Sequence, residues 1–303
     1  MVGFLGILVV FQLVLLCILF FRERRRRREI QSLTLRLERL LHDGEMLPME
    51  EYREGELSIL ANQIQKLALK LTESADRLQA EKAYLADSLA DISHQLRTPM
   101  TAMNLSLSLL ADPELSETQR RQHVAELHGQ LRRMDWLVET LLKLSRLDAD
   151  MVQMEEKSFP VSELIRRAAE PIAVSAELRG QCLTVDCGED ALTGDLSWTT
   201  EAIGNLLKNA SEHTPEGGAI TVRAEENPLF TQISVENTGA GFAPEDLPHL
   251  FERFYRGKDA REGSCGIGLA LARRIISEQR GTIQAENTRD GARFIVKFYK
   301  QIF

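Results

Sequence analysis

The first 21 residues contain no charged side chain and a single amide, Gln12. At about 1.5 Å per helical residue, such a run is long enough to cross the roughly 30 Å hydrocarbon layer of a bilayer. Six arginines follow within residues 22–28, whereas a cleaved signal peptide carries its positive charge before the apolar run. We therefore expect residues 1–21 to form a transmembrane helix rather than a buried core helix. The arginines predict that the rest of the chain is cytoplasmic.

The charge of the remaining chain argues against several classes of protein. The whole sequence has 37 basic and 45 acidic residues, a net charge of −8. Without residues 22–28, which hold six arginines and one glutamate, 31 basic and 44 acidic residues remain. An acidic body repels the phosphates of nucleic acid, so no direct binding to nucleic acid is expected. The four cysteines form no CxxC pair, which argues against a disulfide scaffold and a structural zinc site.

Residues 22–74 have the pattern of a basic juxtamembrane segment followed by a helical linker. Two short stretches with apolar residues at helical spacing, within 30–40 and 57–71, flank a connector that contains Gly44 and Pro48. This arrangement resembles a degenerate HAMP relay. The alternative is an ordinary helical stalk, which fits the same pattern.

Residues 75–150 are predicted to form a helical hairpin, because apolar residues recur at a four-three spacing that is typical of a coiled-coil seam. The first run is Leu85, Leu89, Ile92, Leu96, Pro99 and Met103, and the second is Leu127, Leu131, Met134, Val138 and Leu141. Residues 111–117 supply the turn between the two helices. Each hairpin has one good seam, so we expect two copies to join as a homodimer with a four-helix bundle.

His94 lies two residues past a seam position, where the helix geometry exposes it to solvent. Pro99 follows on the same helix, and a proline inside a helix loosens the preceding turn. The segment His-Gln-Leu-Arg-Thr-Pro at 94–99 resembles the phosphoacceptor box of sensor histidine kinases, whose commonest form is His-Glu-Leu-Arg-Thr-Pro. The resemblance implies that His94 accepts a phosphoryl group and that Gln95 and Thr98 are further catalytic residues.

Residues 155–300 have a different pattern, in which short β-rich runs alternate with helices. Strands are predicted at 182–186, 219–224, 230–236, 282–286 and 294–298, and helices at about 162–178, 196–213 and 267–280. In the middle helix, Asn205 and Asn209 lie one turn apart on the polar face, although asparagine is a poor helix former. Amide oxygens in that position favour a hard cation such as Mg²⁺ and its polyphosphate, and the alternative is an ordinary solvated face.

Two glycine runs point to a phosphate site. Residues 237–241 end a predicted strand in a Gly-x-Gly turn, and residues 263–269 open a helix whose free N–H groups can bind phosphate. Neither run matches Gly-x-x-x-x-Gly-Lys-Ser, so the pattern is not a Walker P-loop. Neither run has the strand, helix and acidic residue of a dinucleotide fold.

Four segments, in this order, resemble the N, first glycine, F and second glycine boxes of histidine kinase catalytic domains: residues 205–209, 237–241, 251–256 and 266–269. The resemblance implies a Bergerat-type α/β sandwich that binds ATP, as in gyrase, the Hsp90 chaperones and MutL. Asn205 and Asn209 would hold Mg²⁺. The implied nucleotide-binding residues are Asn205, Lys208, Asn209, His213, Asn237, Gly239, Gly241, Phe254, Arg256, Gly266, Gly268 and Leu269. A mobile lid is implied at about 242–265, where Arg253 and Arg256 would reach the γ-phosphate or simply solvate the lid.

Three positions depart from the commonest family pattern. Gln95 stands where an acidic general base is usual, Asn237 where an aspartate reads adenine, and Glu212 where a basic residue follows the N box. An asparagine can still accept a hydrogen bond from the adenine amino group through its amide oxygen. We interpret these replacements as tuning of the activity rather than as its loss.

The resemblance implies an α plus α/β chain that acts as a sensor histidine kinase, anchored in the cell membrane by one helix. It would phosphorylate His94 from ATP, pass the phosphoryl group to an aspartate of a response regulator, and in some cases dephosphorylate that regulator. The alternatives are an ATPase of the same GHKL fold and a pseudokinase that only binds nucleotide. Almost nothing precedes the apolar run in this sequence, so we expect the stimulus to come from the bilayer or from a membrane partner protein. The alternative is that the sequence is an N-terminally shortened version of a kinase with two membrane helices.

Overall fold

The computed structural model describes residues 11–28, 30–31, 56–188, 190–257 and 265–300. The chain divides into two compact units, Met1–Asp87 and Ser88–Phe303. In the first unit, residues 11–28 are helical. No helix in the described ranges is both long and apolar enough to cross a membrane. Residues 1–10 of the predicted span and residues 32–55 of the predicted linker lie outside those ranges.

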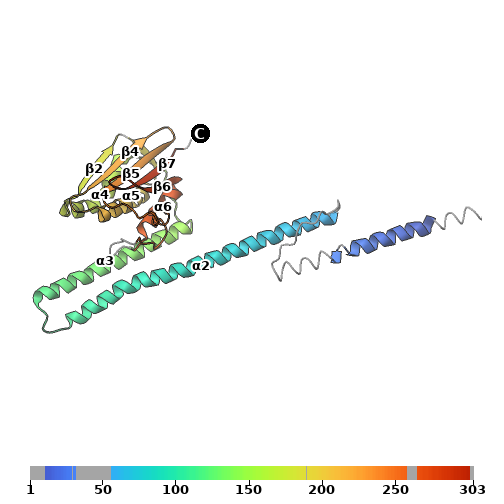
Figure 1. The fold of residues 1–303 in the computed structure, drawn as a ribbon, viewed down its shortest axis with the longest axis horizontal. Helices are drawn as coiled ribbons and strands as arrows, with labels where there is room; N and C mark the ends of the chain where they lie inside the picture. The colour runs from blue at the N-terminus through green and yellow to red at the C-terminus, as the bar shows by residue number, and fades with distance from the viewer. Residues whose placement is uncertain (1–10, 29, 32–55, 189, 258–264, 301–303) are drawn as a thin grey trace, which may run out of the picture. The chain divides into compact units, whose positions relative to one another are not determined.

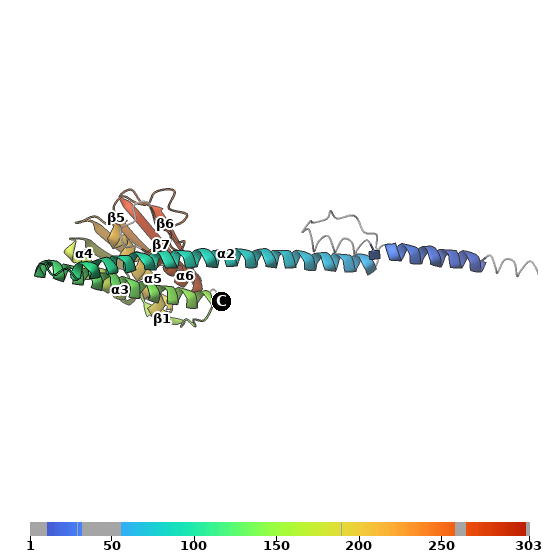
Figure 2. The ribbon, with the colours of Figure 1, turned by 90° about the horizontal axis from the view of Figure 1, so that it is seen from below.

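Helix α2 (Glu56–Leu110) is longer than the sequence pattern indicates. Residues 72–84 have no regular apolar spacing, but most of them are good helix formers, and the helix continues through them. It also continues through Pro99. Helix α3 (Glu117–Asp148) begins with a capping box formed by Ser116 and Gln119. The C-terminal part of α2 and helix α3 lie side by side as the predicted hairpin (Figures 1 and 2), and Ser106 Oγ donates to Glu126 Oε2 across the pair at 3.5 Å.

The C-terminal part of the second unit is a two-layer α/β domain (Figure 1). Its five-stranded sheet has the order β2 (Cys182–Cys187), β4 (Ala219–Glu226), β5 (Phe230–Thr238), β7 (Gly291–Tyr299) and β6 (Gly281–Asn287). Strands β2 and β4 are parallel, and the other neighbouring pairs are antiparallel. One face of the sheet is covered by α4 (Val161–Leu178), α5 (Leu196–His213) and α6 (Gly268–Glu278).

Alternating side chains give the sheet one apolar and one polar face. Val235 of β5 and Phe294 of β7 are fully buried against the helices. On the opposite face, Arg293 forms ion pairs with Glu236 at 2.7 Å and with Glu286 at 3.2 Å. The sheet therefore packs on one side only, which is the arrangement expected for a two-layer sandwich.

The buried core extends beyond the sheet and its three helices. Leu137, Leu144 and Leu147 of α3 are 1%, 2% and 1% exposed, and they belong to the same apolar cluster as the α/β domain. The C-terminal part of α3 thus packs into this domain as well as belonging to the hairpin.

The structure confirms the predicted helix at 196–213 as α5 and adds two strands that the sequence pattern does not predict. The N-terminus of α5 is capped, because Asp195 Oδ1 accepts hydrogen bonds from the N–H groups of Ser197 and Trp198. Strands β1 (Lys157–Pro160) and β3 (Ala191–Gly194) were not predicted, and they form a separate antiparallel pair. Four residues are too few to give a strand periodicity.

Candidate functional site

His94 lies on α2 with its side chain exposed, as its heptad position predicts. Thr98 is also exposed, and its hydroxyl donates to the carbonyl oxygen of His94 at 3.3 Å. Pro99, which is buried, has no N–H to donate to the carbonyl of Gln95, one turn earlier. Gln95 is half-buried, so its amide does not share the full exposure of the imidazole.

A pocket of about 350 Å³ lies between α5, the loop after β5 and the start of α6. This volume falls within the range of about 300–1,000 Å³ that is usual for small-molecule sites. Nine of the predicted nucleotide-binding residues line it: Asn205, Lys208, Asn209, His213, Gly241, Arg256, Gly266, Gly268 and Leu269. The N box, the two glycine boxes and part of the F box therefore meet around one cavity.

Two of the lining positions leave little room for a side chain. Gly266 has a φ of +66°, and an added Cβ would lie 2.4 Å from the carbonyl oxygen of Tyr255. At Gly268, the first residue of α6, an added Cβ would lie 2.8 Å from Asn205 Oδ1. The absence of side chains at these positions brings the N-terminus of α6 close to the polar face of α5. Its first N–H groups and the Asn205 oxygen can then approach the same ligand.

Three predicted residues do not line the pocket. Asn237 is 4% exposed, and its Nδ2 donates to the carbonyl oxygen of Thr238 at 3.2 Å. The Thr238 contact uses the amide nitrogen of Asn237, so it does not use the amide oxygen Oδ1, which is the atom that would accept a hydrogen bond from a ligand. Gly239 is packed so closely that an added Cβ would lie 2.8 Å from the carbonyl oxygen of His213. Phe254 has a φ of +63°, and its N–H donates to the carbonyl oxygen of Gly266 at 2.9 Å. Residues 258–264 of the predicted lid lie outside the described residues.

The pocket also includes residues that the sequence pattern did not reveal. Tyr255 Oη donates to Asp246 Oδ1 at 2.7 Å, and this hydrogen bond, with burial and the negative charge of Asp246, raises the pKa of Tyr255. Helix α3 contributes Arg132, Arg133 and Trp136. No local signal could have identified these three, because they come from the hairpin and not from any of the four boxes.

The lining side chains make the pocket basic. Arg132, Arg133, Lys208 and Arg256 carry positive charge, against the two acidic residues Glu212 and Asp246. Lys208 Nζ lies 4.3 Å from the centre of the Trp136 ring, a cation–π contact that positions the ammonium group. A basic cavity with free backbone N–H groups is suited to a polyphosphate.

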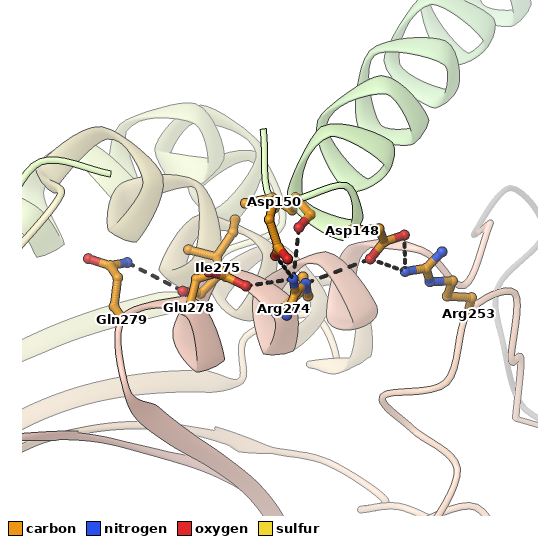
Figure 3. A network of polar contacts seen from close by, with 8 residues as sticks. Asp148, Asp150, Arg253, Arg274, Ile275, Glu278 and Gln279 are labelled. Carbon is orange, nitrogen blue, oxygen red and sulfur yellow. Dashed lines mark hydrogen bonds and ion pairs between the residues drawn. The ribbon is translucent and has the colours of Figure 1, made fainter. Parts of the chain in front are cut away.

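Polar contacts join the end of α3 to the α/β domain (Figure 3). Arg253 Nη2 donates to both carboxylate oxygens of Asp148, at 2.6 and 2.5 Å. Arg274 Nη2 donates to the carbonyl oxygen of Leu147 at 2.7 Å and to Asp150 at 3.2 Å. The sequence-based assignment of Arg253 left a phosphate contact and simple solvation open, and in this structure the guanidinium instead holds the hairpin.

A further ion pair joins Lys143 of α3 to Glu201 of α5 at 3.0 Å. Burial alone would lower the pKa of Lys143, but hydrogen bonds to Glu201 and Glu139, together with the attraction of both charges, more than offset burial and raise it. The ammonium group of Lys143 therefore remains charged at neutral pH.

Comparisons with known proteins identify both parts of the second unit. Residues 84–150 match the His Kinase A (phospho-acceptor) domain, and residues 194–302 match the family of histidine kinase-, DNA gyrase B- and HSP90-like ATPases. The sensor histidine kinase CusS of Escherichia coli O157:H7 is 30% identical over 273 residues, which cover 89% of this chain and 54% of that protein. YclK of Bacillus subtilis is 24% identical over 276 residues, covering 89% and 58%. The chain thus spans a little over half the length of these relatives.

Solved structures share the fold. The histidine kinase AdeS of Acinetobacter baumannii has a TM-score of 0.57 at 21% identity, covering 69% of this chain and 98% of that one. The histidine kinase ThkA, in complex with the response regulator TrrA, has a TM-score of 0.59 at 23% identity, covering 77% and 66%. With a phosphoacceptor hairpin followed by an ATPase domain of this fold, the chain belongs to the sensor histidine kinase family.

Proposed function

We propose that this chain phosphorylates itself on His94 with ATP and then passes the phosphoryl group to an aspartate of a response regulator. The observation that carries the proposal is the exposed His94 in a matched phosphoacceptor hairpin, followed in the same chain by a basic pocket in a matched ATPase domain. In the first step an imidazole nitrogen of His94 attacks the γ-phosphorus, an N–P bond forms, and the P–O bond to ADP breaks. The complex of ThkA with TrrA supports a regulator as the partner.

Within the pocket, Asn205 and Asn209 are the proposed Mg²⁺ ligands. They lie one turn apart on α5 and line the cavity, and Asn205 Nδ2 donates to the carbonyl oxygen of Glu201 at 2.9 Å. That bond fixes the amide so that its oxygen lies beside Gly268. The ion would supply charge neutralisation of the phosphates. The first turn of α6 and the basic side chains would bind and orient the polyphosphate, which is the main requirement for phosphoryl transfer.

The surface of the hairpin supports a homodimer. Val124, Leu131, Val138 and Leu142 of α3 are large apolar residues that are 40–55% exposed, on a helix that is otherwise polar outside. A second hairpin would cover this surface and complete a four-helix bundle. We propose 75–150 as the limits of this dimerisation and phosphotransfer hairpin, and 155–300 as those of the catalytic domain.

The apolar N-terminal run supports anchoring in the cell membrane. The exposed apolar side chains between Phe11 and Phe21 precede the arginine-rich segment, and a bilayer would cover them. We propose a single-pass anchor with the catalytic part in the cytoplasm, where the response regulator is found. The stimulus would then reach the hairpin through residues 22–74, from the bilayer or from a membrane partner protein.

The test is incubation of the full chain, in detergent micelles, with γ-labelled ATP. We expect label that is labile in acid and stable in base, as a phosphoramidate is, and that is absent from His94→Ala. His128→Ala, an exposed histidine on α3, is the control and should label normally. ATP turnover without labelled protein would identify an ATPase of the same fold instead. ATP binding with neither turnover nor label would identify a pseudokinase.

A further inference from the structure

The hairpin supplies one wall of the nucleotide pocket. Arg132, Arg133 and Trp136 occupy about one turn of α3 and face the same cavity as Lys208 and Asn209 of α5. These two segments are far apart in sequence, and the wall belongs to the phosphoacceptor domain rather than to the matched ATPase domain.

Buried contacts fix the position of this wall. Leu137 follows Trp136 directly and is 1% exposed, and Leu144 is 2% exposed in the same core. Lys143, the residue directly before Leu144, pairs with Glu201 of α5. An ion pair and apolar packing therefore hold the same stretch of α3. The side chains that face the pocket are therefore presented by a helix anchored to the pocket's own domain.

The guanidinium of Arg133 has unused hydrogen-bonding capacity. Its Nη2 donates to the thiol of Cys265 at 3.8 Å, and a thiol is a weak acceptor. Its Nε is buried and has no hydrogen-bond partner among the described residues. A buried charged donor without a partner is costly, whereas a phosphate oxygen would satisfy it with a strong, charge-assisted bond.

We infer that Arg133 binds the polyphosphate of the nucleotide, so that the ATP site is completed by the hairpin. This inference rests on the proposed function of the pocket. Trp136 has a positioning role in the same wall, because its ring holds the Lys208 ammonium group at the edge of the cavity. Nucleotide affinity then depends on whether α3 is docked on the catalytic domain.

The test is calorimetric titration of the full chain, in detergent micelles, with ATP and Mg²⁺. Arg133→Met keeps an unbranched side chain with good helix propensity and removes the charge. We expect ATP to bind about tenfold more weakly, the usual effect of losing one hydrogen bond to a charged group, while adenosine binding is unchanged. Arg133→Lys, which restores a charge without the planar fork, should recover part of the loss.

Arg121→Met is the matched control on the same helix. The Arg121 side chain is 80% exposed and pairs with Glu117, and it does not line the pocket, so its variant should bind ATP as the wild type does. Unchanged or tighter ATP binding in Arg133→Met would overturn the inference, and tighter binding would mean that α3 obstructs the pocket. If Asn209→Ala weakens ATP binding while Arg133→Met does not, the inference is wrong and the proposed pocket stands. A wild-type chain that binds no ATP would overturn both.

Discussion

Replacing Leu147 with alanine should destabilise the α/β domain by about 3.5–5 kcal/mol. Leu147 is 1% exposed and belongs to α3, whereas most of its cluster belongs to the sheet and its helices. Truncation of a buried leucine costs about 2–5 kcal/mol, with the larger values where the surroundings cannot close the cavity. The backbone of α3 at Leu147 cannot easily move to fill the cavity, because Arg274 donates a hydrogen bond to the carbonyl oxygen of Leu147 at 2.7 Å. We therefore expect a value in the upper half of that range.

The measurement is urea unfolding of the full chain followed by tryptophan emission. The two tryptophans, Trp136 on α3 and Trp198 on α5, report on both sides of the contact. If tryptophan emission and circular dichroism give the same unfolding transition, unfolding is two-state and a free energy of unfolding can be calculated from it. The control is Leu178→Ala at the end of α4, which is 84% exposed and should change stability by less than about 0.5 kcal/mol. A loss for Leu147→Ala no larger than the control would refute the packing of α3 into the domain.

Three further outcomes are expected. Asn209→Ala should abolish labelling of His94 but leave the urea midpoint unchanged, because it removes a proposed Mg²⁺ ligand from a polar face without opening a cavity; labelling at the wild-type rate would contradict this role. Gln95→Glu should accelerate labelling in a time course, by about 10²-fold or less, if a carboxylate there takes the imidazole proton, and an equal rate would leave Gln95 a packing role. Thr98→Ala should spare labelling and slow dephosphorylation of the regulator, and an equal loss of both activities would assign Thr98 to the helix alone.

The sequence predicts most of the α/β domain because its signals there are local. Asp195 before helix α5 is a capping residue, and the apolar face of that helix repeats at helical spacing. The glycine boxes likewise indicate tight turns at Gly241 and Gly266, where the structure has positive φ angles. Nine of the predicted nucleotide residues then line one pocket, because the boxes lie at the ends of elements that the sheet brings together.

Other features depend on contacts that no local pattern encodes. Residues 72–84 of α2 are rich in good helix formers and lack a regular apolar spacing, so a search for apolar spacing misses the continuity of α2 there. Trp136 and Arg133 reach the pocket because α3 packs on the domain, and the apolar residues responsible, such as Leu144, also fit a hairpin seam. Sequence periodicity identifies an apolar face but not which of two neighbours will cover it.

The polar outer face of the sheet has a consequence for how β5 and β7 can align. In the observed register, Glu236 lies opposite Arg293 and Val235 lies opposite Phe294. Because side chains alternate along a strand, a slip of one residue would turn these charges toward the helices and expose the apolar pair to water. Such a misaligned sheet is strongly disfavoured, so the point at which β5 ends is determined. The loop with Gly239 and Gly241 therefore leaves the sheet at one fixed place, and errors of strand alignment during folding do not displace the pocket.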